Sequence, residues 1–308
     1  MHTSLMEKNH YIFVVDGGGT KTAACLFEKK EGNFIASQEI ARAKGKASGL
    51  ALGVENAKQI IESLLGYCVG MSGADLNHAH IDIVLGLAGS ELPKRASELK
   101  KTLSHLGSIH LISDAHMALL GAHQGKAGIS LTIGTGSVVW AMSSKGKIKR
   151  KGGWGFPAGD KASGAWLGYQ AFSKFLRHKD GLPSKYPFSK ALENHIEETI
   201  GNHPDDWHQF HISAGAKDYG QFAKTILEIA YNDPSDEFCK ALEKQVIKEA
   251  IHMIKAVQKK TPLPIALNGS VALAISSKLA AKRPEWHFIT SKDDPINGGL
   301  IALDIIKN

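Results

Sequence analysis

The sequence predicts an α/β protein of two similar domains in tandem, with a ligand cleft between them. Its 308 residues are 43% hydrophobic and 22% charged, which is enough apolar material for two cores. A strand, a glycine turn and a second strand begin near Tyr11, and the same arrangement begins again near Ile129, about 115 residues later. We therefore expect domains of residues 1–122 and 123–308, with a final helix that can pack back on the N-terminal domain.

The first domain alternates short apolar runs with helical patterns. Strands are expected at Tyr11–Val15, Ala23–Phe27, Phe34–Ile40, Ile81–Leu87 and Ile109–Ile112. Helices are expected at Val54–Leu65, Pro93–His105 and Ala115–His123. Helices that separate strands in this way pack on a sheet.

The second domain repeats the opening and then becomes mainly helical. Strands are expected at Ile129–Ile133, Val138–Met142, Ile265–Leu267 and His287–Ile289. Helices are expected at Ala165–Arg177, Ser189–Ile200, Tyr219–Tyr231, Asp236–Lys259, Val271–Lys282 and after Pro295. The basic segment Lys145–Lys151 follows a strand and contains a glycine, which indicates a hairpin tip.

Cysteine usage and hydropathy exclude several classes of protein. Cys25, Cys68 and Cys239 are far apart and form no CxxC pair, so we expect reduced, buried thiols and no disulfide framework or zinc knuckle. No apolar run approaches the roughly 18 residues that span a bilayer, and the N-terminal segment has no signal-peptide pattern. We expect a cytoplasmic protein without a membrane partner.

The basic and imidazole side chains indicate a small-molecule partner. The formal charge is +7, but the lysines are spread over many segments and form no stripe interleaved with aromatic residues. The histidine pairs His78/His80 and His208/His211 lack further ligands at metal-site spacing. We expect an anionic small substrate or product, no nucleic acid, and a homodimer.

A glycine-rich turn separates the first two strands. The run DGGGTKT at Asp16–Thr22 combines a carboxylate, three glycines and two hydroxyls. Glycine lets backbone N–H groups approach phosphate oxygens closely. Thr20 can add a hydroxyl donor, and Asp16 can hold a magnesium ion directly or through water. The alternative is a glycine-rich hairpin that binds nothing.

Two further elements favour a nucleotide site. The P-loop motif is absent, and the residues after Gly19 read as a strand instead of the helix of a dinucleotide fingerprint. A second turn, Gly134–Ser137, lies between strands and offers the same donors as the first. A third element, Leu267–Ser270, leads into a helix and can approach a nucleoside closely, unless Ser270 only caps that helix.

These three elements, in this order, resemble the phosphate 1, phosphate 2 and adenosine motifs of the sugar kinase, heat-shock ATPase and actin superfamily. The resemblance covers nearly the whole chain and implies two actin-like ATPase (ribonuclease H-like) domains. Longer strings resemble the N-acetylglucosamine kinase family, which includes bacterial glucosamine kinases: SDA at Ser113–Ala115, GGWGFPAGDKASGAWLG at Gly152–Gly168, KDYGQFA at Lys217–Ala223 and LNGSVA at Leu267–Ala272. This resemblance to the N-acetylglucosamine kinase family implies transfer of the γ-phosphate of ATP to the 6-hydroxyl of glucosamine or N-acetylglucosamine.

The resemblance also implies site residues. The ATP-binding residues would be Gly17, Gly18, Gly19, Thr20, Lys21, Gly134, Thr135, Gly136, Ser137, Gly269 and Ser270. The sugar-binding residues would be Ser48, Ala88, Gly89, Asp114, Thr135, Gly153 and Asp160. Asp16 would hold Mg²⁺, and Asp114 would be the catalytic base.

The position of Asp114 suits this role chemically. It follows a buried strand and precedes a helix, at the edge where α/β folds bind ligands, and a carboxylate can accept the proton of an attacking hydroxyl. Ser113 or Asp114 could equally cap the helix, and capping is also the alternative for Asp160. Relatives often have asparagine in the loop that here reads Ala47–Ser48–Gly49, so the preferred hexosamine stays open.

Two other functions fit the sequence less well than a kinase. ATPase activators of acyl-CoA dehydratases or benzoyl-CoA reductases hold an iron–sulfur cluster with cysteines shared across a dimer, but this chain has no cysteine near its second glycine turn. A non-catalytic sugar sensor of the repressor type would need a helix-turn-helix before the first strand, and only ten residues precede Tyr11.

Overall fold

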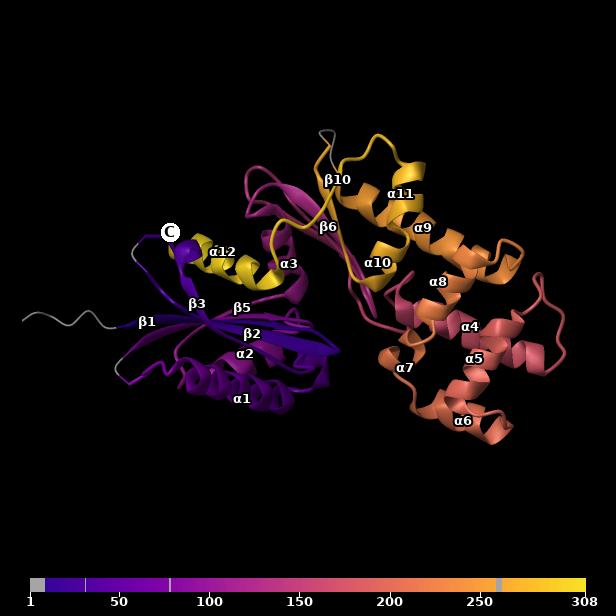
Figure 1. Ribbon diagram of the computed structural model, residues 1–308, viewed down its shortest axis with the longest axis horizontal. Helices are drawn as coiled ribbons and strands as arrows, with labels where there is room; N and C mark the ends of the chain where they lie inside the picture. Colours follow the sequence, from indigo (N-terminus) through magenta and orange to yellow (C-terminus); the bar gives the residue numbers. More distant parts are fainter. Residues whose placement is uncertain (1–8, 31, 78, 259–261) are drawn as a thin grey trace, which may run out of the picture. The chain divides into compact units, whose positions relative to one another are not determined.

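The computed structural model describes residues 9–30, 32–77, 79–258 and 262–308, which form two compact units (Figure 1). Unit 1 holds the chain up to Lys126 together with Ser291–Asn308, and unit 2 holds Ala127–Thr290. The division therefore follows Lys126, where the sequence suggests residue 122. The last helix belongs to unit 1.

Unit 1 is built on a five-stranded sheet with the strand order β3-β2-β1-β4-β5. Its strands are β1 (His10–Gly17), β2 (Lys21–Glu28), β3 (Gln38–Lys46), β4 (His80–Leu87) and β5 (Ser108–Ile112). The first three strands pair antiparallel, whereas β1, β4 and β5 run parallel. The carboxyl ends of β1 and β4 consequently meet at one edge, where Asp16 is paired with Gly86.

Alternate residues of β1 enter two separate cores. Phe13 packs on one face with helices α1 (Val54–Ser72) and α2 (Pro93–Leu103), and Val14 packs on the other face with α3 (Asp114–His123) and α12 (Pro295–Lys307). This alternation follows from the two-residue repeat of a strand that is buried on both faces.

Helix α12 joins unit 1 through very close packing on α3. A Cβ atom at Gly298 would lie 2.0 Å from the carbonyl oxygen of Met117, and one at Gly299 would lie 2.3 Å from Cγ1 of Val14. Figure 1 shows this yellow helix lying with the indigo and purple elements of unit 1. The glycines of the final segment thus allow the end of the chain to return to the first sheet.

Unit 2 repeats the sheet of unit 1. Its strand order is β10-β9-β6-β7-β8. The strands are β6 (Gly128–Ile133), β7 (Ser137–Met142), β8 (Ile148–Gly152), β9 (Ile265–Asn268) and β10 (Phe288–Ile289). As in unit 1, the first three pair antiparallel and the later two add in parallel. The prediction of two similar α/β domains is confirmed.

The helices of unit 2 fall into two groups. A long insertion between β8 and β9 holds α4 (Gly164–Lys179), α5 (Lys190–Ile200), α6 (Pro204–Ser213), α7 (Ala216–Gly220), α8 (Ala223–Asn232) and α9 (Glu237–Val257). Two short helices, α10 (Ser270–Ala274) and α11 (Ser276–Lys282), connect β9 to β10. Helix α9 packs on β6, β7 and β8 and closes the main core of the unit.

The third strand begins later in the chain than the expected Phe34–Ile40. Its apolar start, Phe34–Ala36, is a 3₁₀ turn capped by Asn33, and the strand begins at Gln38. The Phe34 N–H donates to Asp304 Oδ1 at 3.2 Å, so α12, which is distant in the sequence, helps to hold this turn. The true strand lies at the edge of the sheet, which explains its polar sequence.

Other expectations are also corrected. Two expected helices are each divided in two, after Gly220 and at Ile275, and helix α6 was not expected. The hairpin predicted at the basic segment is confirmed: β7 and β8 pair antiparallel, the Ser143 N–H donates to the Lys147 carbonyl in the turn between them, and residues from Ile148 onward belong to β8. Lys259 and His78 lie outside the described residues. None of the described helices is both long and apolar enough to cross a membrane.

The fold places two of the histidines beside one carboxylate. Strands β1 and β4 bring His10 and His80 beside Asp82, although these residues showed no metal-site spacing in the sequence. Parallel pairing of strands that lie far apart in the chain produces this cluster.

Candidate active site

The first glycine turn presents an open face at the end of β1. The Gly18 N–H donates to the Lys21 carbonyl at 3.0 Å and closes the turn. Gly19 and Thr20 are exposed, and a Cβ atom on Gly19 would have no neighbour within 4 Å. A phosphate can approach this backbone closely.

Gly17 faces the interior instead. A Cβ atom there would lie 2.1 Å from Ser48 Oγ and 2.5 Å from Leu87 Cδ2. Ser48 is fully buried and bonds to Thr22 Oγ1 at 2.7 Å, while the Thr22 hydroxyl donates to the Lys46 carbonyl at 2.6 Å. The Ser48 hydroxyl is therefore the donor to Thr22 Oγ1, and Ser48 packs against the buried side of the turn. A contact between Ser48 and the sugar stays a prediction.

Backbone hydrogen bonds hold two loops against this turn. The Gly49 N–H donates to the Gly18 carbonyl at 3.1 Å, and the Ala88 N–H donates to the Gly17 carbonyl at 2.9 Å. Gly89 has φ +82°, a conformation that favours glycine. The predicted sugar-binding loops thus lie beside the predicted phosphate turn within unit 1. A side chain at Gly49 would begin 3.3 Å from the Gly18 carbonyl oxygen, so a larger residue there would require the turn to shift by a few tenths of an ångström.

Three carboxylates gather near the end of β1. Burial and the negative charge of Asp114 raise the pKa of Asp16 to about 7; Asp294 adds to this effect and Lys21 opposes it. The sequence interpretation missed Asp294, which caps α12 and accepts a hydrogen bond from Arg42 at 3.0 Å. The signal for it was an aspartate directly before a proline at the start of a helix.

Asp114 does not cap its helix. Ser113 is the N-cap of α3, and its hydroxyl oxygen accepts the His116 N–H at 3.1 Å. Asp114 is the first residue of the helix, is half-buried, and accepts the Ala115 N–H at 2.8 Å. The capping alternative therefore applies to Ser113, and the Asp114 carboxylate lies close enough to Asp16 to raise its pKa.

The second glycine turn is tied to the start of α4 in unit 2. The Gly134 N–H donates to the Gly136 carbonyl at 3.0 Å. The Gly134 carbonyl accepts from Gly164 at 2.7 Å, and the Thr135 carbonyl accepts from Ala165 at 3.2 Å. The turn is thus held by the start of α4, which lies within the segment Gly152–Gly168.

The third element lies directly against the second turn. Gly269 has φ +87°, and a Cβ atom there would lie 2.5 Å from the Ile133 carbonyl oxygen and 2.9 Å from Gly134 N. Glycine is required by both the conformation and this approach. Gly269 is also the N-cap of α10, so the alternative in which Ser270 caps that helix is wrong.

Asp160 lies beside the second turn. A Cβ atom at Gly136 would meet Asp160 Oδ2 at 2.7 Å, and Asp160 Oδ1 accepts the Gly155 N–H at 3.3 Å. Burial raises the pKa of Asp160, and backbone hydrogen bonds from Gly155 and Ser137 partly offset this. The N-cap of α4 is Ser163, which accepts the Trp166 N–H at 3.1 Å, so Asp160 is not a cap.

Two other predicted residues support this loop. The Ser137 hydroxyl is buried and donates to the Lys161 carbonyl at 2.9 Å. Gly153 has φ +71°, and its carbonyl accepts a hydrogen bond from Arg150 at 2.6 Å. These contacts fix the segment on which Asp160 is carried.

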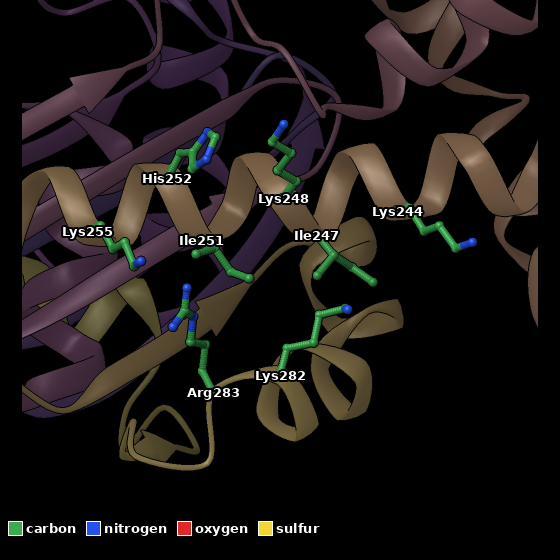
Figure 2. Close-up of a pocket in the computed structure, with 8 residues that line it drawn as sticks. All are labelled: Lys244, Ile247, Lys248, Ile251, His252, Lys255, Lys282 and Arg283. Atoms are coloured by element: carbon green, nitrogen blue, oxygen red, sulfur yellow. The ribbon is translucent and has the colours of Figure 1, made fainter.

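A basic pocket of about 370 Å³ lies elsewhere in unit 2, away from the predicted site residues. Figure 2 shows side chains of α9 above it and Lys282 and Arg283 rising toward them from below. The lining residues are Lys244, Ile247, Lys248, Ile251, His252, Lys255, Lys282 and Arg283. Among the described residues, none that lines the pocket is acidic, so the pocket favours anions. The sequence signal that was missed is lysine at a four-residue spacing on one helix face.

Comparisons with known proteins identify a family and several similar sequences. The sequence profile of the BadF/BadG/BcrA/BcrD ATPase family matches residues 15–286. The chain is 29% identical to the glucosamine kinase of Vibrio cholerae serotype O1 over 95% of each chain. It is 25% identical to the N-acetyl-D-glucosamine kinase of Dictyostelium discoideum over 96% of this chain and 99% of the other.

A solved structure gives the same result. The candidate N-acetylglucosamine kinase from Chromobacterium violaceum is 29% identical to this chain and superimposes with a TM-score of 0.82, covering 95% of this chain and 98% of that one. The predicted family resemblance and the actin-like ATPase architecture are thereby confirmed.

Proposed function

The chain belongs to the BadF/BadG/BcrA/BcrD ATPase family, and from this premise we propose that it is an ATP-dependent amino-sugar kinase. The observation that carries the proposal is its similarity to a glucosamine kinase across 95% of both chains. The acceptor is the 6-hydroxyl of glucosamine or N-acetylglucosamine. The proposed protein is a homodimer and lies in the cytoplasm. Light scattering after size-exclusion chromatography tests the dimer.

The glycine turns of both units bind the nucleotide in this proposal. In unit 1 the open backbone at Gly19 receives phosphate oxygens, and the packed Gly17 keeps the turn in place. In unit 2 Thr135 and the backbone around Gly269 contribute further contacts. The supporting observation is that each turn is held by hydrogen bonds to neighbouring loops, so it is ordered before a ligand binds.

Asp16 is the magnesium ligand of the proposal. Oxygen atoms of carboxylates are the donors that Mg²⁺ prefers, and Asp16 has two more carboxylates as neighbours. A bound cation would relieve the repulsion among the three neighbouring carboxylates, which is why Mg²⁺ fits at Asp16. When bound, Mg²⁺ neutralises charge on the transferred phosphoryl group.

Asp114 acts as the general base. Its carboxylate accepts the proton of the sugar hydroxyl as the oxygen–phosphorus bond forms and the bond to ADP breaks. Ser113, and not Asp114, is the N-cap of the helix, and Asp114 is the first residue after it. Asp160 accepts hydrogen bonds from other sugar hydroxyls, assisted by the loops at Ser48, Gly89 and Gly153.

The iron–sulfur alternative is less well supported. Cys25, Cys68 and Cys239 are free and fully buried, and each belongs to a different hydrophobic core. A cluster shared across a dimer needs thiolates that gather at a surface. The cysteines of this chain are therefore structural.

A coupled ADP-release assay with five sugars tests the proposed function. The substrates are glucosamine, N-acetylglucosamine, N-acetylmannosamine, N-acetylmuramate and glucose. We expect one of the first two to have the highest kcat/KM. ADP release that is the same with every sugar and without sugar would contradict the kinase.

A further inference from the structure

Three histidines and a lysine surround one buried carboxylate in unit 1. Asp82, on β4, is fully buried. Its Oδ2 atom lies 2.8 Å from His10 Nε2 and 3.3 Å from His80 Nε2. Its Oδ1 atom lies 2.7 Å from His110 Nε2 and 3.1 Å from Lys307 Nζ. Each carboxylate oxygen therefore has its own pair of partners.

The cluster lies at the amino-terminal ends of β1 and β4, whereas the first glycine turn follows the carboxyl end of β1. His10 opens β1 and pairs in register with His80, which opens β4. Asp16 lies near the other end of β1, roughly 20 Å away at the usual rise per residue of a strand. The cluster is thus separate from the groups assigned to phosphoryl transfer.

The geometry of three donor atoms matches a metal site. The ligand atoms of His10, His80 and Asp82 all lie within 4.8 Å of one another. Ligands about 2.0–2.2 Å from a zinc ion lie roughly 3.3 Å apart at tetrahedral angles. We propose that His10, His80 and Asp82 bind a divalent transition-metal ion such as zinc.

The chemistry of these donors selects the kind of metal. Two imidazole nitrogens and one carboxylate oxygen suit zinc and its first-row neighbours, whereas Mg²⁺ prefers oxygen ligands. Coordination through Nε2 requires neutral imidazoles that carry their proton on Nδ1.

The second carboxylate oxygen remains supported when the ion binds. His110 and Lys307 stay on Oδ1 and orient the carboxylate. The His80 side chain is 48% exposed, which gives the ion an entry route and leaves room for water as a further ligand.

The site stabilises unit 1. Its ligands join the starts of β1 and β4, and Lys307 connects it to the end of α12. An ion bound only by the folded protein raises the melting temperature.

Isothermal titration calorimetry of the chelator-treated full-length protein with Zn²⁺, without nucleotide, tests the site. We expect one ion per chain in the wild type. His80→Ala and His10→Ala should each weaken binding at least about tenfold. Zinc should raise the melting temperature of the wild type but not that of His80→Ala.

His105→Ala is the matched control. His105 is also exposed, lies in unit 1 and contacts Glu62 at 3.4 Å, so its loss should leave zinc affinity unchanged. His80→Ala decides the result if His10→Ala does not fold, since the His80 ring is half exposed. Unchanged zinc affinity in folded His80→Ala would overturn the proposed metal site. The histidines would then only form hydrogen bonds with Asp82.

Discussion

The two units share one sheet but differ in what surrounds it. In both, three antiparallel strands are followed by two that add in parallel on the other side of the first. Unit 1 connects its third and fourth strands through α1, whereas unit 2 inserts helices α4 to α9 at the same place. The sheet therefore tolerates large insertions at this connection, and the glycine turn after the first strand is kept in both units.

The turns differ in charge as well. The turn of unit 1 ends a strand beside the carboxylates Asp16, Asp114 and Asp294. The turn of unit 2 lies against the backbone of Gly269 and one carboxylate, Asp160. This difference suggests that unit 1 carries the metal and the base, while unit 2 mainly supplies neutral donors. The predictions below test that division.

Asp114→Asn should have the largest effect. The change keeps the size of the side chain but removes the proton acceptor, so turnover should fall by roughly 10² to 10⁴ with the best sugar. The melting temperature should remain near that of the wild type, because Ser113 caps the helix.

Ser113→Ala is the control for this result. It should cost about 1 kcal/mol of stability, measured by urea unfolding, and leave most turnover intact. Near-normal turnover in a folded Asp114→Asn protein would show that Asp114 is not the general base.

Asp16→Asn should affect the metal more than the sugar. Losing this oxygen ligand should raise the Mg²⁺ concentration needed for half-maximal turnover at least about tenfold. Sugar affinity, measured by calorimetry without nucleotide, should change little. An equal loss of sugar affinity would mean that Asp16 does not serve the nucleotide side of the reaction.

The glycines of the first turn should separate stability from binding. Gly17→Ala would place a Cβ atom 2.1 Å from Ser48 Oγ, so it should destabilise the protein by about 1–3 kcal/mol. Gly19→Ala meets no neighbour within 4 Å and should leave stability near that of the wild type. If the turn holds phosphate, Gly19→Ala should still weaken ATP binding. Equal stability of the two variants in urea would contradict this packing.

This pair also marks what sequence could and could not predict. The strand-turn-strand pattern was readable because the apolar runs on either side are local. The sequence shows three equivalent glycines, and only the fold distinguishes the packed Gly17 from the open Gly19. Phe34 was misassigned because its partner, Asp304, lies near the other end of the chain.

The same limit applies to charged residues. Asp294 was missed because its significance comes from Asp16 and Arg42, which reach it only when α12 returns to unit 1. The cluster around Asp82 was missed because the strands that supply it are distant in the chain. Motif spacing reports local geometry, so sites assembled by strand pairing are invisible to it.

The smallest effects are expected in unit 2, where Asp160→Asn and Ser163→Ala form a matched pair. Asp160 has φ +56°, a conformation that asparagine tolerates, so Asp160→Asn should change the free energy of unfolding by less than about 0.5 kcal/mol. Its effect should instead be on the sugar, with KM raised about tenfold, because an amide is a weaker acceptor than a carboxylate. Ser163→Ala should do the reverse and cost about 1 kcal/mol of stability, since it removes the cap of α4, with little change in KM. Urea unfolding and steady-state kinetics on both variants measure the two quantities separately. If Asp160→Asn lowers stability and leaves KM unchanged, Asp160 only supports the loop, and unit 2 contributes no side-chain contact from this position to the sugar.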